Sequence, residues 1–175
     1  MRLSLARGIA LGTVLLAMPA LPAYAEMAIT NLAKVNTQVI EKQGWTVRKQ
    51  ARRMSLFCGG CREFTATDVI LDRVNDGTEG RIRSGRTTAR TMLDQCRQNA
   101  KRMGGGACYG VQPVKVKGAV GFVSDTSLGP MGYASTYVLW QDGRRLTIRN
   151  AAPSRQAARQ NGQVMFRALA PQIVR

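Results

Sequence analysis

The sequence predicts an α+β fold, in which two to three helices pack on an antiparallel sheet of about five to six strands built from hairpins or a meander. Runs of β-type residues are joined by short turn signals, as is typical of hairpins. Between these runs lie segments whose apolar residues recur at helical spacing on one face. The predicted order of elements is roughly α-β-β-β-α-β-β-β-α.

The first half of the chain contains one predicted helix and three predicted strands. Apolar residues recur at near-helical spacing over residues 30–43, and Gly44 is placed to end that helix. Strand-like segments begin at residue 45 and then cover residues 54–57 and 65–74. The last two segments flank a Gly-Gly pair, which predicts a hairpin.

Residues 87–103 carry the clearest internal helical pattern. Thr87 is a candidate N-cap, and the glycines at 104–106 can end the helix because glycine tolerates the left-handed conformation. The predicted apolar face consists of Ala89, Met92, Leu93, Cys96, Ala100 and Met103. One strand is expected over residues 114–124, followed by a loop over residues 125–132 in which Asp125, Thr126 and Ser127 are ordinary polar residues.

Residues 133–149 contain the strongest hairpin signal in the chain. Asp142-Gly143 suits a two-residue type I′ turn. The turn sets the pairs Leu139–Leu146 and Tyr137–Ile148 on one face, and Trp140–Arg145 and Val138–Thr147 on the other.

A final helix is predicted from a Ser154 cap to about Ala170, where Pro171 limits it. Its apolar stripe is Ala157, Ala158, Val164, Met165, Ala168 and Leu169. Arg155, Arg159 and Arg167 lie outside that stripe.

The first 25 residues have the pattern of a secretory signal peptide. Arg2 and Arg7 form a positive region, residues 8–18 are apolar, and Ala23-Tyr24-Ala25 offers a small-x-small cleavage site. We therefore expect a signal peptide over residues 1–25 and a single secreted α+β domain over residues 26–175. The predicted location is periplasmic or secreted, with no stable membrane insertion after cleavage.

The charge of the chain is strongly positive, with 26 Lys and Arg residues against 10 Asp and Glu residues. Arg2 and Arg7 leave with the signal peptide, so the mature charge is 24 − 10 = +14. Such a field attracts anions, which in a cell envelope are lipid head groups, lipopolysaccharide phosphates, acidic glycans and acidic proteins. Coding bias and solubility are the alternative explanation of this composition. Nucleic acid is disfavoured, because the protein is exported and has few aromatic residues for stacking.

The chain contains no histidine. This absence removes Ser-His-Asp and Cys-His catalysis and most zinc catalytic sites. Asp68 and Asp72 share one face of a predicted strand, but neither has an evident partner for acid–base chemistry. We therefore do not expect an enzyme or a cofactor.

Cys58 and Cys61 form a C-x-x-C pair, and Cys96 and Cys108 complete an even set. Four cysteines allow three connectivities; we favour Cys58–Cys61 and Cys96–Cys108, because the glycines after residue 103 can return the chain to Cys96. An oxidising compartment favours disulfides, and no metal site is expected. The alternatives are thiol–disulfide exchange at Cys58 and Cys61 and a four-cysteine zinc site.

Several basic residues are candidates for binding an anion, because the predicted elements place them on shared faces. These candidates are Arg145, Arg149, Arg155, Arg159, Lys115 and Lys117. The two lysines share a predicted strand face, and Arg145 and Arg149 share one beside Trp140. If the helix and hairpin surfaces adjoin, their arginines form one basic patch.

These observations predict an exported, non-enzymatic protein that binds an anionic envelope component or an acidic protein partner. The alternative hypothesis is a thiol–disulfide redox protein that uses Cys58 and Cys61.

Overall fold

The computed structural model of the protein describes residues 27–61, 63–102 and 106–175. The predicted signal peptide, its cleavage site and Met103 lie outside these residues. In chain order the elements are η1 (Leu32–Lys34), α1 (Gln38–Glu41), β1 (Thr46–Lys49), β2 (Arg53–Cys58), β3 (Thr65–Arg73), α2 (Thr78–Arg83), α3 (Ala89–Arg102), β4 (Cys108–Val116), β5 (Ala119–Ser127), η2 (Gly129–Met131), β6 (Tyr133–Gln141), β7 (Arg144–Ala152) and α4 (Arg155–Ile173).

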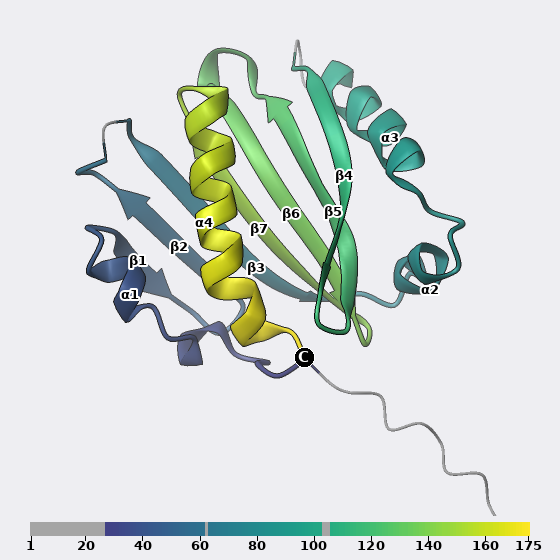
Figure 1. Ribbon diagram of the computed structural model, residues 1–175, viewed down its shortest axis with the longest axis horizontal. Helices are drawn as coiled ribbons and strands as arrows, with labels where there is room; N and C mark the ends of the chain where they lie inside the picture. Colours follow the sequence, from purple (N-terminus) through teal and green to yellow (C-terminus); the bar gives the residue numbers. More distant parts are fainter. Residues whose placement is uncertain (1–26, 62, 103–105) are drawn as a thin grey trace, which may run out of the picture.

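The strands form one seven-stranded antiparallel sheet in the order β1-β2-β3-β7-β6-β5-β4 (Figure 1). The last four strands form a meander, and β7 then pairs with β3, which joins the two halves of the chain. The predicted antiparallel α+β fold is confirmed. The predicted five to six strands and two to three helices are too few, because the described residues contain seven strands and four α-helices.

The missed strand is β4, at the edge of the sheet. The prediction treated residues 114–124 as one strand, whereas the chain turns at Lys117-Gly118 and divides this stretch between β4 and β5. Lys117 adopts a φ of 50°, which is uncommon for a residue with a side chain. A Lys-Gly pair is a weak turn signal. Pro113 also argued against a strand here, because proline is tolerated only in edge strands, and β4 is such an edge strand.

Two helical predictions are also corrected, and one helix was missed. The helix predicted over residues 30–43 is divided into η1 and α1, and α2 was not predicted. Helix α3 begins one residue later than expected, because the Thr88 hydroxyl, not that of Thr87, accepts a hydrogen bond from the Thr91 amide.

The hairpin of β6 and β7 matches its prediction residue by residue. All four predicted cross-strand pairs occur in the observed register. Asp142 and Gly143 both have positive φ, 53° and 69°, as a type I′ turn requires.

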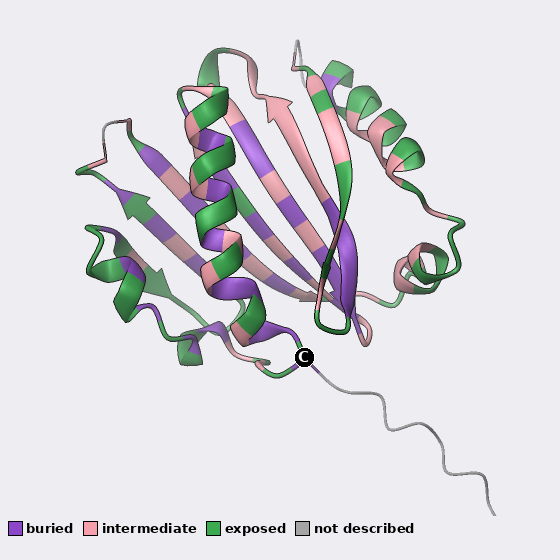
Figure 2. Ribbon diagram, viewed as in Figure 1, coloured by how far each residue is buried: buried purple, intermediate pink, exposed green. Residues whose placement is uncertain are grey.

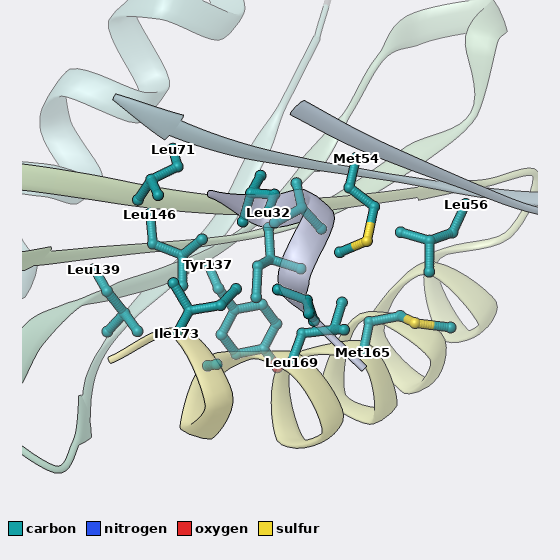
Figure 3. Packing of buried hydrophobic residues seen from close by; sticks show 14 of the residues in the cluster. Leu32, Met54, Leu56, Leu71, Tyr137, Leu139, Leu146, Met165, Leu169 and Ile173 are labelled. Atoms are coloured by element: carbon teal, nitrogen blue, oxygen red, sulfur yellow. The ribbon is translucent and has the colours of Figure 1, made fainter. Parts of the chain in front are cut away.

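Helix α4 covers one face of the sheet, packing mainly on β6 and β7 (Figures 1 and 2). The main core lies between this helix and the sheet, where Leu139, Leu146, Met165, Leu169 and Ile173 point toward one another (Figure 3). Burial of these apolar side chains is the dominant stabilising contribution to such a layer.

The last helix departs from its prediction at two residues. Pro171 lies inside α4, which continues to Ile173. The helix continues because Ile173 is fully buried and only two residues of α4 follow the missing N–H group of proline. Val164 was placed on the apolar stripe but is 48 % exposed, since the buried stripe passes through its neighbour Met165.

Helix α3 lies beside β4 and β5 at the sheet edge. Its side chains share a hollow with Ile70 and Val138, which project from the sheet face opposite α4. No helix within the described residues is long and apolar enough to span a membrane.

Candidate functional site

A pocket of about 350 Å³ opens between α4 and the strands β4, β5 and β6. One wall is formed by strand residues that include Tyr109, Asp125, Ser135 and Tyr137. The other wall is formed by helix residues that include Arg155, Arg159, Gln163, Phe166 and Arg167. We call this space the α4 pocket.

The helix wall follows from residue spacing on α4. Arg155, Arg159, Gln163 and Arg167 are each four residues apart, so they form one row along the helix surface. This row borders the pocket, while Met165 and Leu169 on an adjacent face are buried in the core. The helix therefore presents three guanidinium groups on the side of the sheet where β4 and β5 lie.

The arginines make few contacts with acidic side chains. The guanidinium carbon of Arg155 lies 4.3 Å from the centre of the Tyr109 ring, a cation–π contact. Arg159 Nε is 3.9 Å from Asp125 Oδ2, too far for a hydrogen bond. The Arg159 side chain is also 61 % exposed, so this pair contributes little to stability.

Asp125 and Ser135 each place a buried polar atom in the α4 pocket. They face each other directly across β5 and β6. Ser135 is 1 % exposed; its Oγ forms no well-aligned hydrogen bond among the described residues, but it lies close enough to the Tyr137 hydroxyl to lower the pKa of that group. Oδ1 of Asp125 has no hydrogen-bond partner within the described part of the chain, and the Asp125 side chain is 16 % exposed. Unsatisfied buried polar atoms are rare and point to a missing partner.

Tyr137 contributes an aromatic surface and a hydroxyl group. Its ring stacks on that of Phe166 with the centres 4.2 Å apart. Burial raises the pKa of Tyr137 above its ordinary value, and the charge of Asp125 acts in the same direction. Arg159 and Arg167 oppose this shift, so charges of both signs act on the Tyr137 hydroxyl.

The predicted basic candidates divide between the two faces of the sheet. Arg155 and Arg159 border the α4 pocket. Arg145 and Arg149 alternate along β7 with Leu146 and Ile148, which point into the α4 core, so the two arginines lie on the opposite face. The single basic patch that the sequence suggested is therefore not formed.

Arg145 and Arg149 have acidic neighbours that the sequence did not reveal. Arg145 donates to Asp72 at 2.8 Å, and Arg149 lies opposite Asp68 in the register of β3 and β7. Asp68 also accepts hydrogen bonds from Ser55 and Arg53. Pairing of β3 with β7 thus supplies the basic partner of Asp72, and pairing of β3 with β2 supplies the partners of Asp68.

The two candidate lysines do not share a strand face. Lys115 lies on β4 and is exposed, whereas Lys117 lies in the following turn. The Lys117 ammonium donates a hydrogen bond to the carbonyl oxygen of Pro171 on α4. Neither lysine borders the α4 pocket.

The four cysteines form the two predicted disulfides, Cys58–Cys61 and Cys96–Cys108. Thiolate ligands for zinc would require these bonds to be reduced. Cys61 is partly exposed and borders a hollow together with Gln156 and Ala157 in the first turn of α4. No cluster of metal-ligating side chains occurs in the ranges that the structure describes.

Several pocket residues were missed by the sequence reasoning. Asp125 was expected in a loop, but β5 extends to Ser127 and directs Asp125 toward α4. The four-residue spacing of Arg155, Arg159, Gln163 and Arg167 was a usable signal for the helix wall. No comparable signal marks Tyr109 or Ser135, because strand order brings them to the pocket. Comparison of the chain with known protein families, curated proteins and solved structures gives no match.

Proposed function

We propose that this protein is an exported, non-enzymatic binding protein of the cell envelope, and that it holds an anionic ligand in the α4 pocket. The observation that carries the proposal is the row of three arginines on α4, which faces a pocket bordered by one carboxylate, that of Asp125. Guanidinium groups bind carboxylate and phosphate strongly through paired hydrogen bonds.

The surroundings of the three arginines leave them available to a ligand. Arg155 packs on an aromatic ring, and Arg159 approaches Asp125 without hydrogen bonding to it. The excess of basic residues over the whole chain adds a long-range field that attracts anions toward the protein. Affinity at the pocket should therefore fall as salt screens these charges, over about 8–10 Å at physiological ionic strength.

The test compares two triple variants that change the net charge equally. In the first, Arg155, Arg159 and Arg167 are replaced by Gln; in the second, the exposed α3 residues Arg90, Arg97 and Arg102 are replaced by Gln. Titration calorimetry with phosphate, acetate and glucuronate measures binding at low and high salt. We expect the pocket variant to lose at least tenfold in affinity and the α3 variant to change less than twofold. Equal losses of affinity in the two variants would mean that net charge alone causes the binding, which would contradict a site in the pocket. The absence of binding of any of the three anions would also contradict the proposal.

A second candidate function is thiol–disulfide exchange, favoured by the position of Cys61 beside the first turn of α4. A helix N-terminus stabilises a nearby thiolate. In this reaction the Cys58–Cys61 disulfide takes two electrons and two protons from a donor dithiol, which becomes a disulfide. The resulting Cys58–Cys61 dithiol passes them to a substrate disulfide, which becomes a dithiol, and the Cys58–Cys61 bond forms again. Turnover in an insulin-reduction assay with dithiothreitol, abolished by Cys61→Ser, would support this function.

A further inference from the structure

We propose that the ligand of the α4 pocket is an acidic sugar, a small anion that also carries hydroxyl groups. This inference rests on the proposed anion-binding function and adds the chemical class of the ligand. The unpartnered Asp125 Oδ1 lies in the same pocket as the arginines, and it carries the inference together with the nearby Ser135 and Tyr137 hydroxyls.

Asp125 sets the first requirement. A carboxylate is a hydrogen-bond acceptor only, and its Oδ1 is buried without a partner in the described residues. A ligand must therefore bring a donor to Asp125. Phosphate dianion and acetate have little or no donor capacity, and their charge is repelled by the same carboxylate.

The charge of the pocket determines which donor is favoured. Three guanidinium groups and one carboxylate border the pocket, so its border remains net positive. An ammonium group placed on Asp125 would be repelled by these arginines, whereas a neutral hydroxyl would not. A sugar hydroxyl thus suits Asp125, while the acidic group of the same sugar suits the arginines.

Ser135 and the aromatic residues complete the match. The Ser135 hydroxyl is buried beside the Tyr137 hydroxyl, and it forms no well-aligned hydrogen bond within the described residues. A hydroxyl can both donate to and accept from a second hydroxyl. Tyr109 and the Tyr137–Phe166 stack offer apolar surface to the C–H groups of a sugar ring. The volume of about 350 Å³ lies at the lower end of the range for small-molecule sites.

The experiment measures selectivity among three simple probes: glucuronate, glucose and acetate. Titration calorimetry at low salt should give wild-type protein at least tenfold tighter binding of glucuronate than of either acetate or glucose. Asp125→Asn removes the charge and keeps the shape. We expect it to strengthen acetate binding and to reduce the preference for glucuronate over acetate about tenfold. Asp94→Asn on the exposed surface of α3 is the matched control and should leave the preference unchanged.

The outcomes separate this inference from the proposed function. If acetate binds as tightly as glucuronate and both depend on the α4 arginines, anion binding stands and the sugar assignment is overturned. If the preference survives in Asp125→Asn, the assignment is likewise overturned. Should Asp125→Asn fail to fold, Ser135→Ala takes its place. This variant must weaken the binding of glucuronate at least threefold and leave the binding of acetate unchanged. If no probe binds, both proposals fail.

Discussion

Gly162 of α4 lies directly over Ser135 of β6. A Cβ atom placed on Gly162 would lie 3.2 Å from the Ser135 Cβ and 3.4 Å from that of Asn150 on β7. The absence of a side chain therefore allows the helix to approach these two strands closely. This close approach sets the position of α4, and with it the arginine row that borders the α4 pocket.

Replacing Gly162 with Ala should destabilise the protein by about 1–3 kcal/mol, because the added methyl group overpacks the contact with β6. Gly80→Ala in α2 is the matched control, since a Cβ there meets nothing within 4 Å. In a helix this substitution normally stabilises by about 0.5–1 kcal/mol. Urea unfolding of both variants measures the difference. Stabilisation by Gly162→Ala would show that the helix does not depend on this contact.

The disulfides should leave no reactive thiol in the native protein. Labelling under denaturing, non-reducing conditions is expected to give no modified cysteine. Paired replacement of Cys96 and Cys108 by Ala should cost about 3 kcal/mol, because the bond closes a loop with a sequence separation of 12. Urea unfolding of wild type and variant, each with and without reductant, provides the measurement; a wild-type protein insensitive to reductant would contradict the prediction.

Tyr137 should make stability fall at alkaline pH. The tyrosine is neutral in both states at neutral pH, and its pKa in the folded protein is raised above the ordinary value of 10.0. The unfolded chain therefore loses this proton at a lower pH than the folded protein does. As the pH rises from 10.0 to the higher pKa of the folded state, the free energy of unfolding decreases.

Tyr137→Phe keeps the ring and removes the proton. Comparing urea unfolding of wild type and variant at about pH 9 and about pH 11 isolates this residue from other groups that titrate in that range. The variant should lose less stability over the interval. An equal loss in both proteins would mean that Tyr137 ionises equally easily in the folded and unfolded states.

If the protein is exported as proposed, processing should yield a chain that begins at Glu26, as the Ala23-Tyr24-Ala25 pattern predicts. N-terminal sequencing of protein recovered from the periplasm or medium provides the measurement. A retained Met1 in the soluble fraction would contradict both the cleavage and the predicted location.

The features predicted most accurately are those with a local cause. Asp142-Gly143 determined its hairpin and every cross-strand pair, because a two-residue turn sets the register of both strands. Ser154 was recognised as the cap of α4, and its hydroxyl accepts a hydrogen bond from the Ala157 amide. By contrast, Lys117-Gly118 is a turn without a distinctive sequence signal, so β4 was missed.

Only one of the two walls of the candidate site could be predicted from the sequence. The helix half is visible in the sequence, since Arg155, Arg159 and Arg167 lie off the apolar stripe of α4. The strand half is not, because Tyr109, Asp125 and Ser135 lie on three different strands. The expectation that Arg145 and Arg149 join the helix arginines failed for the same reason.

The sequence by itself determined the α+β class, the final hairpin and the strong positive charge, because each depends on composition or on residues close in the chain. It favoured one of three possible cysteine connectivities, and the structure shows that one. The tertiary structure alone decided which charges meet. Pairing of β7 with β3 supplied the acidic neighbours of Arg145 and Arg149, and the packing of α4 on β6 and β7 brought its arginines to Asp125. Those choices depend on long-range packing of apolar faces, and no short stretch of residues records which face a helix will cover.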